Sequence, residues 1–313
     1  MNASLRMRDE SVSDQDLADL VARCAEGGED VTPPTREILE NLSNDGILLA
    51  IHGSTPVGVC AMSFSDGERD ASLKFLGVHP DRRRAGLGRR LLMEAEGVAR
   101  KNGFQTLRTG SAVDSNHVAA TGLLKQAGWN PVFGASLKMW RELNDLPVAR
   151  TPAGYRIRTY ETGDDTTFVR IKNAAFMSEN AGGRAWTSAD FEKEYLDSPY
   201  FDPKRVLFAI CGDEPVGTTT AWTATNQGRD VGLIHWVAVV PEHRSKGLGW
   251  VLNVRALHKL RALGYGEAIL NTSETLESAV RLYRRLGFEV ILRRALYEKP
   301  LKGRRSPSVI AQR

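Results

Sequence analysis

Cysteine, net charge and long hydrophobic runs are all scarce in this 313-residue sequence. Its three cysteines, Cys24, Cys60 and Cys211, form no Cys-x-x-Cys pair, so neither a disulfide framework nor a zinc site is indicated. We therefore expect a protein without a bound metal in the reducing cytoplasm. The formal net charge of +4 is too small to indicate a nucleic-acid partner. No apolar run is long enough for a membrane span or a secretion signal, so we expect no membrane partner.

Apolar residues are frequent enough for two folded domains. Hydrophobic residues make up 42% of the chain, and at roughly 150 residues per domain its length predicts two domains. The two halves also share a pattern, because Val239 lies 161 positions after Val78 and Gly247 lies 161 positions after Gly86. A strand, a loop and a helix recurring in register indicate a duplicated unit.

The predicted strands and helices follow the same order in both halves. In the first half, Ser13 and Asp14 are predicted to cap a helix, and Leu87–Lys101 has the apolar spacing of a longer one. Strands near Trp129–Phe133 and Ser136–Trp140 are expected to close the first sheet. The second half has the corresponding long helix at Leu248–Leu263, a helix at Leu276–Leu286, and closing strands at Phe288–Leu292 and Ala295–Glu298.

The stretch 142–154 has no sustained apolar period and is interpreted as a linker. We therefore predict an N-terminal domain at 1–145 and a C-terminal domain at 153–300. Residues 301–313 are polar and basic, and we expect them to form a disordered tail.

The repeated loop has the chemistry of a phosphate site. It reads Arg-Arg-Ala-Gly-Leu-Gly at 83–88 and Arg-Ser-Lys-Gly-Leu-Gly at 244–249. Where a strand turns into a helix, unpaired backbone amides and the helix dipole favour an anion. The glycines permit close approach, and the basic side chains Arg244 and Lys246 supply charge. Neither loop has the third glycine of a dinucleotide fingerprint or the Gly-Lys-Ser/Thr of a Walker A motif.

Both loops fit the pattern Val-x-Pro-x-x-Arg-x-x-Gly-x-Gly, and in the second half Leu-Tyr-x-x-Leu-Gly-Phe follows at 282–288. This combination resembles the GCN5-related N-acetyltransferases (GNAT), and the chain is identified as a tandem member. The resemblance implies an α/β (α+β) fold of two mixed, mainly antiparallel sheets with flanking helices. It also implies acetyl-CoA as a substrate. The residues implied to contact CoA are Val237, Ala238, Val239, Arg244, Ser245, Lys246, Gly247, Leu248, Gly249 and Asn271 in the second half, and Leu76, Val78, Arg83, Arg84, Gly86, Leu87 and Gly88 in the first.

The resemblance assigns the chemistry to the second half. Tyr283 matches the tyrosine that commonly protonates the leaving thiolate in this family, whereas the first half has Leu124 at that position. Many members carry a glutamate base on the fourth strand, but here that position is Leu233. His235 lies two residues on, on the same strand face, and is the candidate base. A main-chain amide around residues 237–239 is expected to stabilise the oxyanion.

The expected reaction is direct transfer of acetyl to a small-molecule amine in a ternary complex, by a monomer or homodimer. Two alternatives stay open. The chain could be a CoA-binding or regulatory module without turnover. It could also be a thiol-biosynthesis acetyltransferase, because the tandem arrangement resembles the mycothiol synthases, although Leu233 replaces their strand glutamate.

Overall fold

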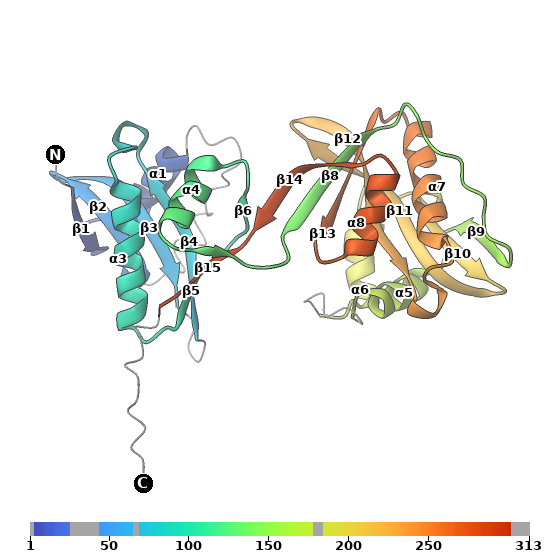
Figure 1. The fold of residues 1–313 in the computed structure, drawn as a ribbon, viewed down its shortest axis with the longest axis horizontal. Coiled ribbons are helices and arrows are strands. Elements are labelled where there is room, and N and C mark those ends of the chain that lie inside the picture. The colour runs from blue at the N-terminus through green and yellow to red at the C-terminus, as the bar shows by residue number, and fades with distance from the viewer. Residues whose placement is uncertain (1–2, 26–43, 65–68, 178–183, 302–313) are drawn as a thin grey trace, which may run out of the picture. The chain divides into compact units, whose positions relative to one another are not determined.

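The computed structural model describes residues 3–25, 44–64, 69–177 and 184–301. The chain forms two compact units (Figure 1). Unit 1 comprises Met1–Ala135 together with Leu292–Arg313, and unit 2 comprises Ser136–Ile291. Each unit is a mixed, mainly antiparallel sheet with flanking helices, as the resemblance implied. Among the described residues, no helix has the length and apolar character needed to cross a membrane.

The sheet of unit 1 has the order β1-β2-β3-β4-β5-β15-β7, and only the β4–β5 pair is parallel. Alternate residues of its strands face two helical layers. Leu48 packs in one core with α3, whereas its neighbour Leu49 packs in another with α1. The elements of unit 1 are β1 (Ser4–Met7), α1 (Asp14–Ala25), β2 (Ile47–His52), β3 (Thr55–Ser63), β4 (Asp70–Val78), α3 (Leu87–Lys101), β5 (Thr106–Thr109), β6 (Val113–Asp114), α4 (Val118–Gln126), β7 (Asn130–Pro131) and β15 (Tyr297–Pro300).

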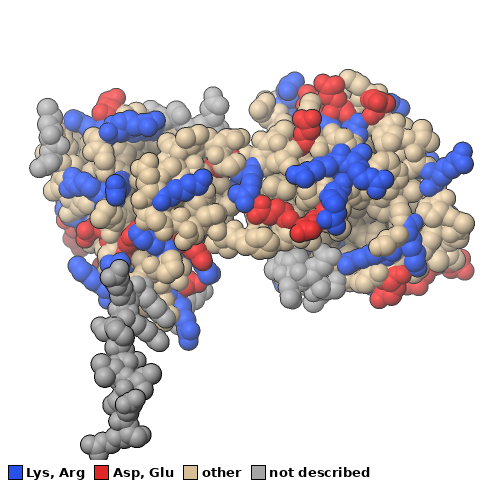
Figure 2. Space-filling model, in the orientation of Figure 1, with Lys and Arg blue, Asp and Glu red and all other residues tan. Residues whose placement is uncertain are grey.

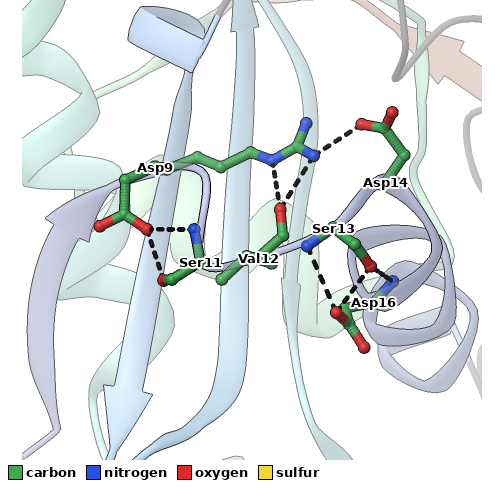
Figure 3. Close-up of polar contacts among 7 residues, drawn as sticks. Asp9, Ser11, Val12, Ser13, Asp14 and Asp16 are labelled. Carbon is green, nitrogen blue, oxygen red and sulfur yellow. Dashed lines mark hydrogen bonds and ion pairs between the residues drawn. The ribbon is translucent and has the colours of Figure 1, made fainter.

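A capping box begins α1 (Figure 3). Asp16 N donates to Ser13 Oγ at 3.1 Å, and Ser13 N donates to the Asp16 carboxylate at 3.3 Å. These two bonds satisfy backbone donors that the helix itself leaves unpaired. The predicted cap at Ser13 is therefore confirmed, whereas Asp14 pairs with Arg8 instead.

Unit 2 repeats this plan with the strand order β8-β13-β12-β11-β10-β9, in which β12 and β13 are parallel. Between α6 and β10 the chain makes one π-helical segment, Glu192–Leu196. The elements of unit 2 are β8 (Ser136–Glu142), β9 (Tyr155–Thr159), α5 (Asp165–Met177), α6 (Ser188–Phe191), β10 (Val206–Cys211), β11 (Glu214–Asn226), β12 (Arg229–Val239), α7 (Leu248–Ala262), β13 (Glu267–Ser273), α8 (Glu277–Arg285) and β14 (Glu289–Ala295), which continues into unit 1.

The closing strands are exchanged between the two halves of the sequence. Strand β8 pairs with β13 over seven residues, from Ser136–Ser273 to Glu142–Glu267, and so belongs to the second sheet. Strand β15 pairs with β5 and completes the first sheet. The expectation that Ser136–Trp140 closes the first sheet is wrong. As a result, the compact units differ from the predicted ranges 1–145 and 153–300. An alternating strand pattern does not specify which of two similar sheets the strand joins.

Each exchanged strand carries a cation, the buried Arg141 or the partly buried Lys299, that binds the end of a helix. In unit 2, the Arg141 guanidinium of β8 donates to the carbonyl of Leu286, the C-cap residue of α8. In unit 1, Lys299 Nζ of β15 donates to the carbonyl of Ala127, the C-cap residue of α4, at 2.6 Å. It also bonds the buried Glu96 carboxylate at 2.7 Å. A cation at a helix C-terminus meets unpaired carbonyls and the negative end of the helix dipole.

The last described residue, Leu301, was expected to begin the tail. Leu301 is buried, and its amide donates to the carbonyl of Gln105 at 2.7 Å. Leu301 therefore belongs to unit 1 rather than to the predicted tail. The rest of that tail, 302–313, lies outside the described residues.

Candidate active site

The two glycine loops have the same backbone conformation. Arg84 and Ser245 have φ values of 64° and 61°, and Gly86 and Gly247 follow with 77° and 82°. Each glycine is the N-cap of a 15-residue helix, α3 or α7, and neither cap makes a side-chain hydrogen bond. The first-turn amides therefore lack a side-chain cap and, with the helix dipole, form a site suited to an anion. Leu87 or Leu248 begins the helix and packs inside each core, and Gly88 or Gly249 follows in the first turn.

The first arginine of each loop holds the loop in place. Arg244 donates to the carbonyls of Val239, at 3.3 Å, and Ala175, at 2.8 Å. Arg83 makes the equivalent bonds to Val78 and Cys24, both at 3.1 Å. Each side chain thus ties its loop to the preceding strand and to the first helix of its unit. The sequence suggested that Arg244 supplies charge to the phosphates, but its guanidinium is engaged with protein carbonyls.

Basic side chains from α8 lie next to the loop of unit 2. A Cβ on Gly249 would lie 3.2 Å from Leu282 Cδ2, so α8 packs against the first turn of α7. The Arg285 guanidinium lies 5.3 Å from the ring centre of Trp250, in that same turn. Figure 2 shows Lys and Arg side chains gathered over α8. Together with exposed Lys246 in the loop, these charges favour a polyanion at this helix end.

The corresponding helix of unit 1 is much less basic. Its sequence is VAATGLLKQ, with Lys125 as its one basic residue, against ESAVRLYRR in α8. The sequence contained this difference, since the two helices align through Gly128 and Gly287. The arginines of α8 were not among the site residues predicted from sequence, which distinguished the two helices only by Leu124 and Tyr283.

Strand β12 contains a bulge beside the candidate base. Thr218 pairs with Ala238 and Thr220 with His235, so one residue of β11 faces both Trp236 and Val237. Trp236 has a φ of 48°, a left-handed conformation that is rare for a bulky residue. The splay expected around 237–239 thus begins one residue earlier. At the position matching Trp236, Phe75 of unit 1 has no positive φ.

Glu194 is the unpredicted partner of His235. It comes from the π-helical segment, and its Oε1 lies 2.6 Å from His235 Nε2 and accepts a bond from Trp236 Nε1 at 2.8 Å. Burial alone raises the pKa of Glu194. The hydrogen bonds from His235 and Trp236 and the charge of Lys172 outweigh it, so the pKa lies below its usual range. Because an ionised carboxylate only accepts, His235 Nε2 carries the proton and Nδ1 keeps its lone pair when the ring is neutral.

Sequence reasoning missed Glu194 because it lies 41 residues from His235, in a polar segment without a motif. The next residue of this segment, Tyr195, contacts Thr220 of β11, at 3.3 Å between hydroxyls. Single π-helical turns often occur at functional sites.

Tyr283 lies in α8 and is buried against the core of unit 2. Burial raises the pKa of its hydroxyl, so the phenol is protonated and able to donate at neutral pH. In unit 1 the matching Leu124 is an apolar core residue, and the residue matching His235 is the exposed Lys74.

The remaining predicted residues take their places in the two sheets. Leu76 and Val78 lie at the end of β4, and Val237, Ala238 and Val239 at the end of β12, each next to its loop. Asn271 is exposed on β13 and pairs with Lys138 of the exchanged strand. No group of three or more potential ligands for a metal ion is found among the described residues.

The model of the acetyltransferase (GNAT) family matches residues 15–129 and 173–288, one match in each half. The chain belongs to the GNAT family of acetyltransferases. This GNAT protein is 34% identical to the mycothiol acetyltransferase of Thermomonospora curvata over 226 residues, which cover 71% of this chain and 72% of that one. It is 30% identical to the mycothiol acetyltransferase of Mycolicibacterium smegmatis over 275 residues, covering 85% and 89%.

Solved structures share the tandem GNAT fold. A GCN5-related N-acetyltransferase from Sphaerobacter thermophilus superposes with a TM-score of 0.58 at 23% identity, covering 96% of both chains. A tandem GNAT protein from the clavulanic acid biosynthesis pathway superposes with a TM-score of 0.56 at 21% identity, covering 96% of this chain and 99% of that one. At these identities the likeness concerns the fold alone.

Proposed function

We propose that this GNAT enzyme transfers acetyl from acetyl-CoA to a small-molecule amine by direct attack, and that unit 2 carries out the chemistry. The observation that carries the proposal is the Glu194–His235 pair, which lies beside a strand bulge in the unit that also holds Tyr283. Unit 1 has the phosphate loop but Lys74 and Leu124 in place of the base and the acid. We assign unit 1 a non-catalytic role.

In the proposed mechanism, the loop of unit 2 binds the CoA pyrophosphate at the start of α7, with Lys246 and the arginines of α8 nearby. His235 Nδ1 takes a proton from the acceptor ammonium, and Glu194 stabilises the imidazolium that forms. The free amine then attacks the thioester carbonyl. A main-chain amide at the bulge stabilises the oxyanion. As the C–S bond breaks, Tyr283 gives its phenolic proton to the thiolate. The second proton of the attacking nitrogen passes through water to the tyrosinate, and His235 releases the first to solvent, so the products are the amide, free CoA and one proton.

A mycothiol acetyltransferase activity is the second candidate, and two observations favour it. Two relatives of that name are 34% and 30% identical to this chain over 226 and 275 residues, which cover 71% and 85% of its length. Leu233 stands where those enzymes are expected to carry a strand glutamate, but Glu194 brings a carboxylate to the same strand from the π-helical segment. A cytoplasmic enzyme would suit acetyl-CoA, and the free cysteines favour that location.

The test measures CoA release from acetyl-CoA with a panel of amines that includes desacetylmycothiol. We expect a competent amine to be turned over by the wild type, and Tyr283→Phe to lower kcat by about 10²-fold. Glu194→Gln should lower kcat while leaving the KM for acetyl-CoA unchanged, because the carboxylate is assigned to the base and not to CoA. Tyr200→Phe, at an exposed tyrosine of unit 2, is the matched control.

Equal turnover by wild type and Tyr283→Phe would remove the assigned acid. Calorimetric titration with acetyl-CoA tests the alternative of a binding module without turnover and counts the sites. One site would mean that packing closes the first loop, and binding without turnover of any amine would favour the module.

A further inference from the structure

A buried lysine lies between two tryptophan rings next to the Glu194–His235 pair. Lys172, from the middle of α5, is 6% exposed. Its Nζ lies 3.8 Å from the ring centre of Trp186 and 4.0 Å from that of Trp236. No hydrogen bond or ion pair joins Lys172 to another residue of the described chain. The ring faces are thus its close partners, and such cation–π contacts are strongest when they are shielded from water.

Both rings are held by hydrogen bonds of their own. The Asn173 side chain donates to the Trp186 carbonyl and accepts from its amide, each at 2.9 Å, so α5 fixes Trp186 beside Lys172. The Trp236 indole donates to Glu194 Oε1, the oxygen that also contacts His235. The two tryptophan rings meet at 5.1 Å between centres with their planes inclined at 70°. A continuous set of contacts therefore leads from Lys172 through Trp236 to Glu194 and His235.

Trp236 needs such support because its backbone is strained. A left-handed φ in a bulky residue is energetically unfavourable and persists only where neighbouring groups enforce it. Two contacts of the indole can do so here. Its face meets the Lys172 ammonium, and its N–H bonds Glu194. In unit 1, Phe75 at this position has no positive φ, so the strain accompanies the unit that has the base.

We propose that Lys172 is a positioning residue for acetyl transfer: its ammonium holds Trp236 in the bulge, so that Glu194 orients His235 as the base. This inference rests on the proposed function of the Glu194–His235 pair. Lys172 acts through Trp236 and Glu194 and needs no contact with either substrate.

The charges around Lys172 make its role dependent on pH. Burial lowers the pKa of Lys172 to about 8, opposed by the carboxylates of Glu194 and Asp190 and assisted by Arg184. His235 faces the same carboxylate from β12. Since the cation–π contact needs the ammonium, the contact weakens as pH rises through about 8. We therefore expect a fall in kcat on the alkaline side that belongs to Lys172.

Two substitutions separate the charge of Lys172 from its packing. Lys172→Met keeps the length and loses the charge. We expect kcat to fall by about tenfold or more below about pH 8, with the KM for acetyl-CoA within about twofold, and the deficit to shrink above that pH as the wild type loses its own ammonium. Lys172→Arg keeps a cation that does not titrate. We expect this variant to retain most of kcat and to lose the fall above about pH 8. Lys193→Met, at an exposed lysine of the π-helical segment, is the control.

A second measurement does not depend on turnover. The ring signals of His235, assigned with a His235→Gln variant, are followed by NMR from pH 5 to 10 in wild type and Lys172→Arg. We expect a second inflection near pH 8 in the wild type, reporting Lys172, and its loss in the arginine variant. Absence of that inflection, or an unchanged alkaline limb in Lys172→Arg, overturns the proposal even if Lys172→Met fails to fold. An intact inflection without turnover of any amine counts against acetyl transfer and leaves the coupling of Lys172 to His235 standing.

Discussion

Replacing Arg141 by methionine removes the cation that β8 provides to the last turn of α8. Arg141 is 8% exposed, and its guanidinium donates to three carbonyls, those of Leu286, Asp145 and Glu142. The bond to Leu286 is buried, and the other two are partly buried. Methionine fills much of the same space but leaves these acceptors without a donor, so the loss is mainly electrostatic.

The magnitude follows from the burial of each bond. A hydrogen bond to a charged group contributes about 1.5–3 kcal/mol, and a buried acceptor left unpaired loses that in full. Water can replace the two partly buried bonds, which adds about 1 kcal/mol. We expect Arg141→Met to lower the free energy of unfolding of unit 2 by about 3 kcal/mol, or roughly 6–12 °C in Tm for a unit of this size. Activity should also fall as unit 2 unfolds, because α8 carries Tyr283.

Urea and thermal unfolding, followed by circular dichroism, measure this loss. The matched control is Arg281→Met. Arg281 lies on α8 itself, its side chain is 67% exposed, and it pairs with Glu277. An exposed i,i+4 pair contributes only about 0.5 kcal/mol, so the control should unfold almost as the wild type does. If both variants unfold alike, water satisfies the carbonyl of Leu286, and the exchanged strand does not stabilise α8 in the way described here.

Three further outcomes are expected. Lys299→Met should lower the stability of unit 1 by about 3–5 kcal/mol, because Glu96 keeps a buried charge without its ion-pair partner, and Glu96→Gln in the same background should recover part of the loss in a thermal melt. Burial alone raises the pKa of Asp164, but hydrogen bonds from Arg158 and a backbone amide outweigh it, so the pKa lies below its usual range. The Arg158–Asp164 pair therefore stabilises the fold at pH values above the unfolded carboxyl pKa, and this stabilisation is lost as pH falls through the folded pKa. Urea melts should show the difference between wild type and Asp164→Asn shrinking from pH 7 towards pH 3, and a constant difference would contradict this assignment. Gly247→Ala places a Cβ in ordinary van der Waals contact with Pro152 Cγ, at 3.8 Å, but at a φ of 82°, so it should cost about 1 kcal/mol of stability and weaken acetyl-CoA binding in a calorimetric titration. Unchanged affinity would exclude this loop as the phosphate site.

The glycine loops were predictable from sequence because their requirements are local. A strand, a left-handed glycine and a helix follow one another within a few residues, and the helix predicted at Leu87–Lys101 is found with those bounds. The capping box at Ser13 is local in the same sense. The GNAT motifs then placed Tyr283 and His235 in one unit.

The partners of these residues were not predictable, because they are distant in sequence. Glu194 lies in a polar helical turn that resembles any solvated surface, and only the fold brings it to His235. Lys172 falls at an inward position of α5, where a cation is unexpected without a visible partner. Arg244 was assigned by type alone, and sequence contains no sign that protein carbonyls already engage it.

The exchanged strands affect how the protein could be divided. A cut in the segment between β8 and β9 would separate the two GNAT motifs cleanly along the sequence. Each fragment would nevertheless carry a strand of the other fragment's sheet: β8 would remain with the first fragment and β15 with the second. Neither piece alone would contain a complete unit, whereas the two expressed together could restore both sheets. An ancestral duplication that produced this chain would therefore have made its copies dependent on each other, and later loss of either half would remove part of the one that stayed.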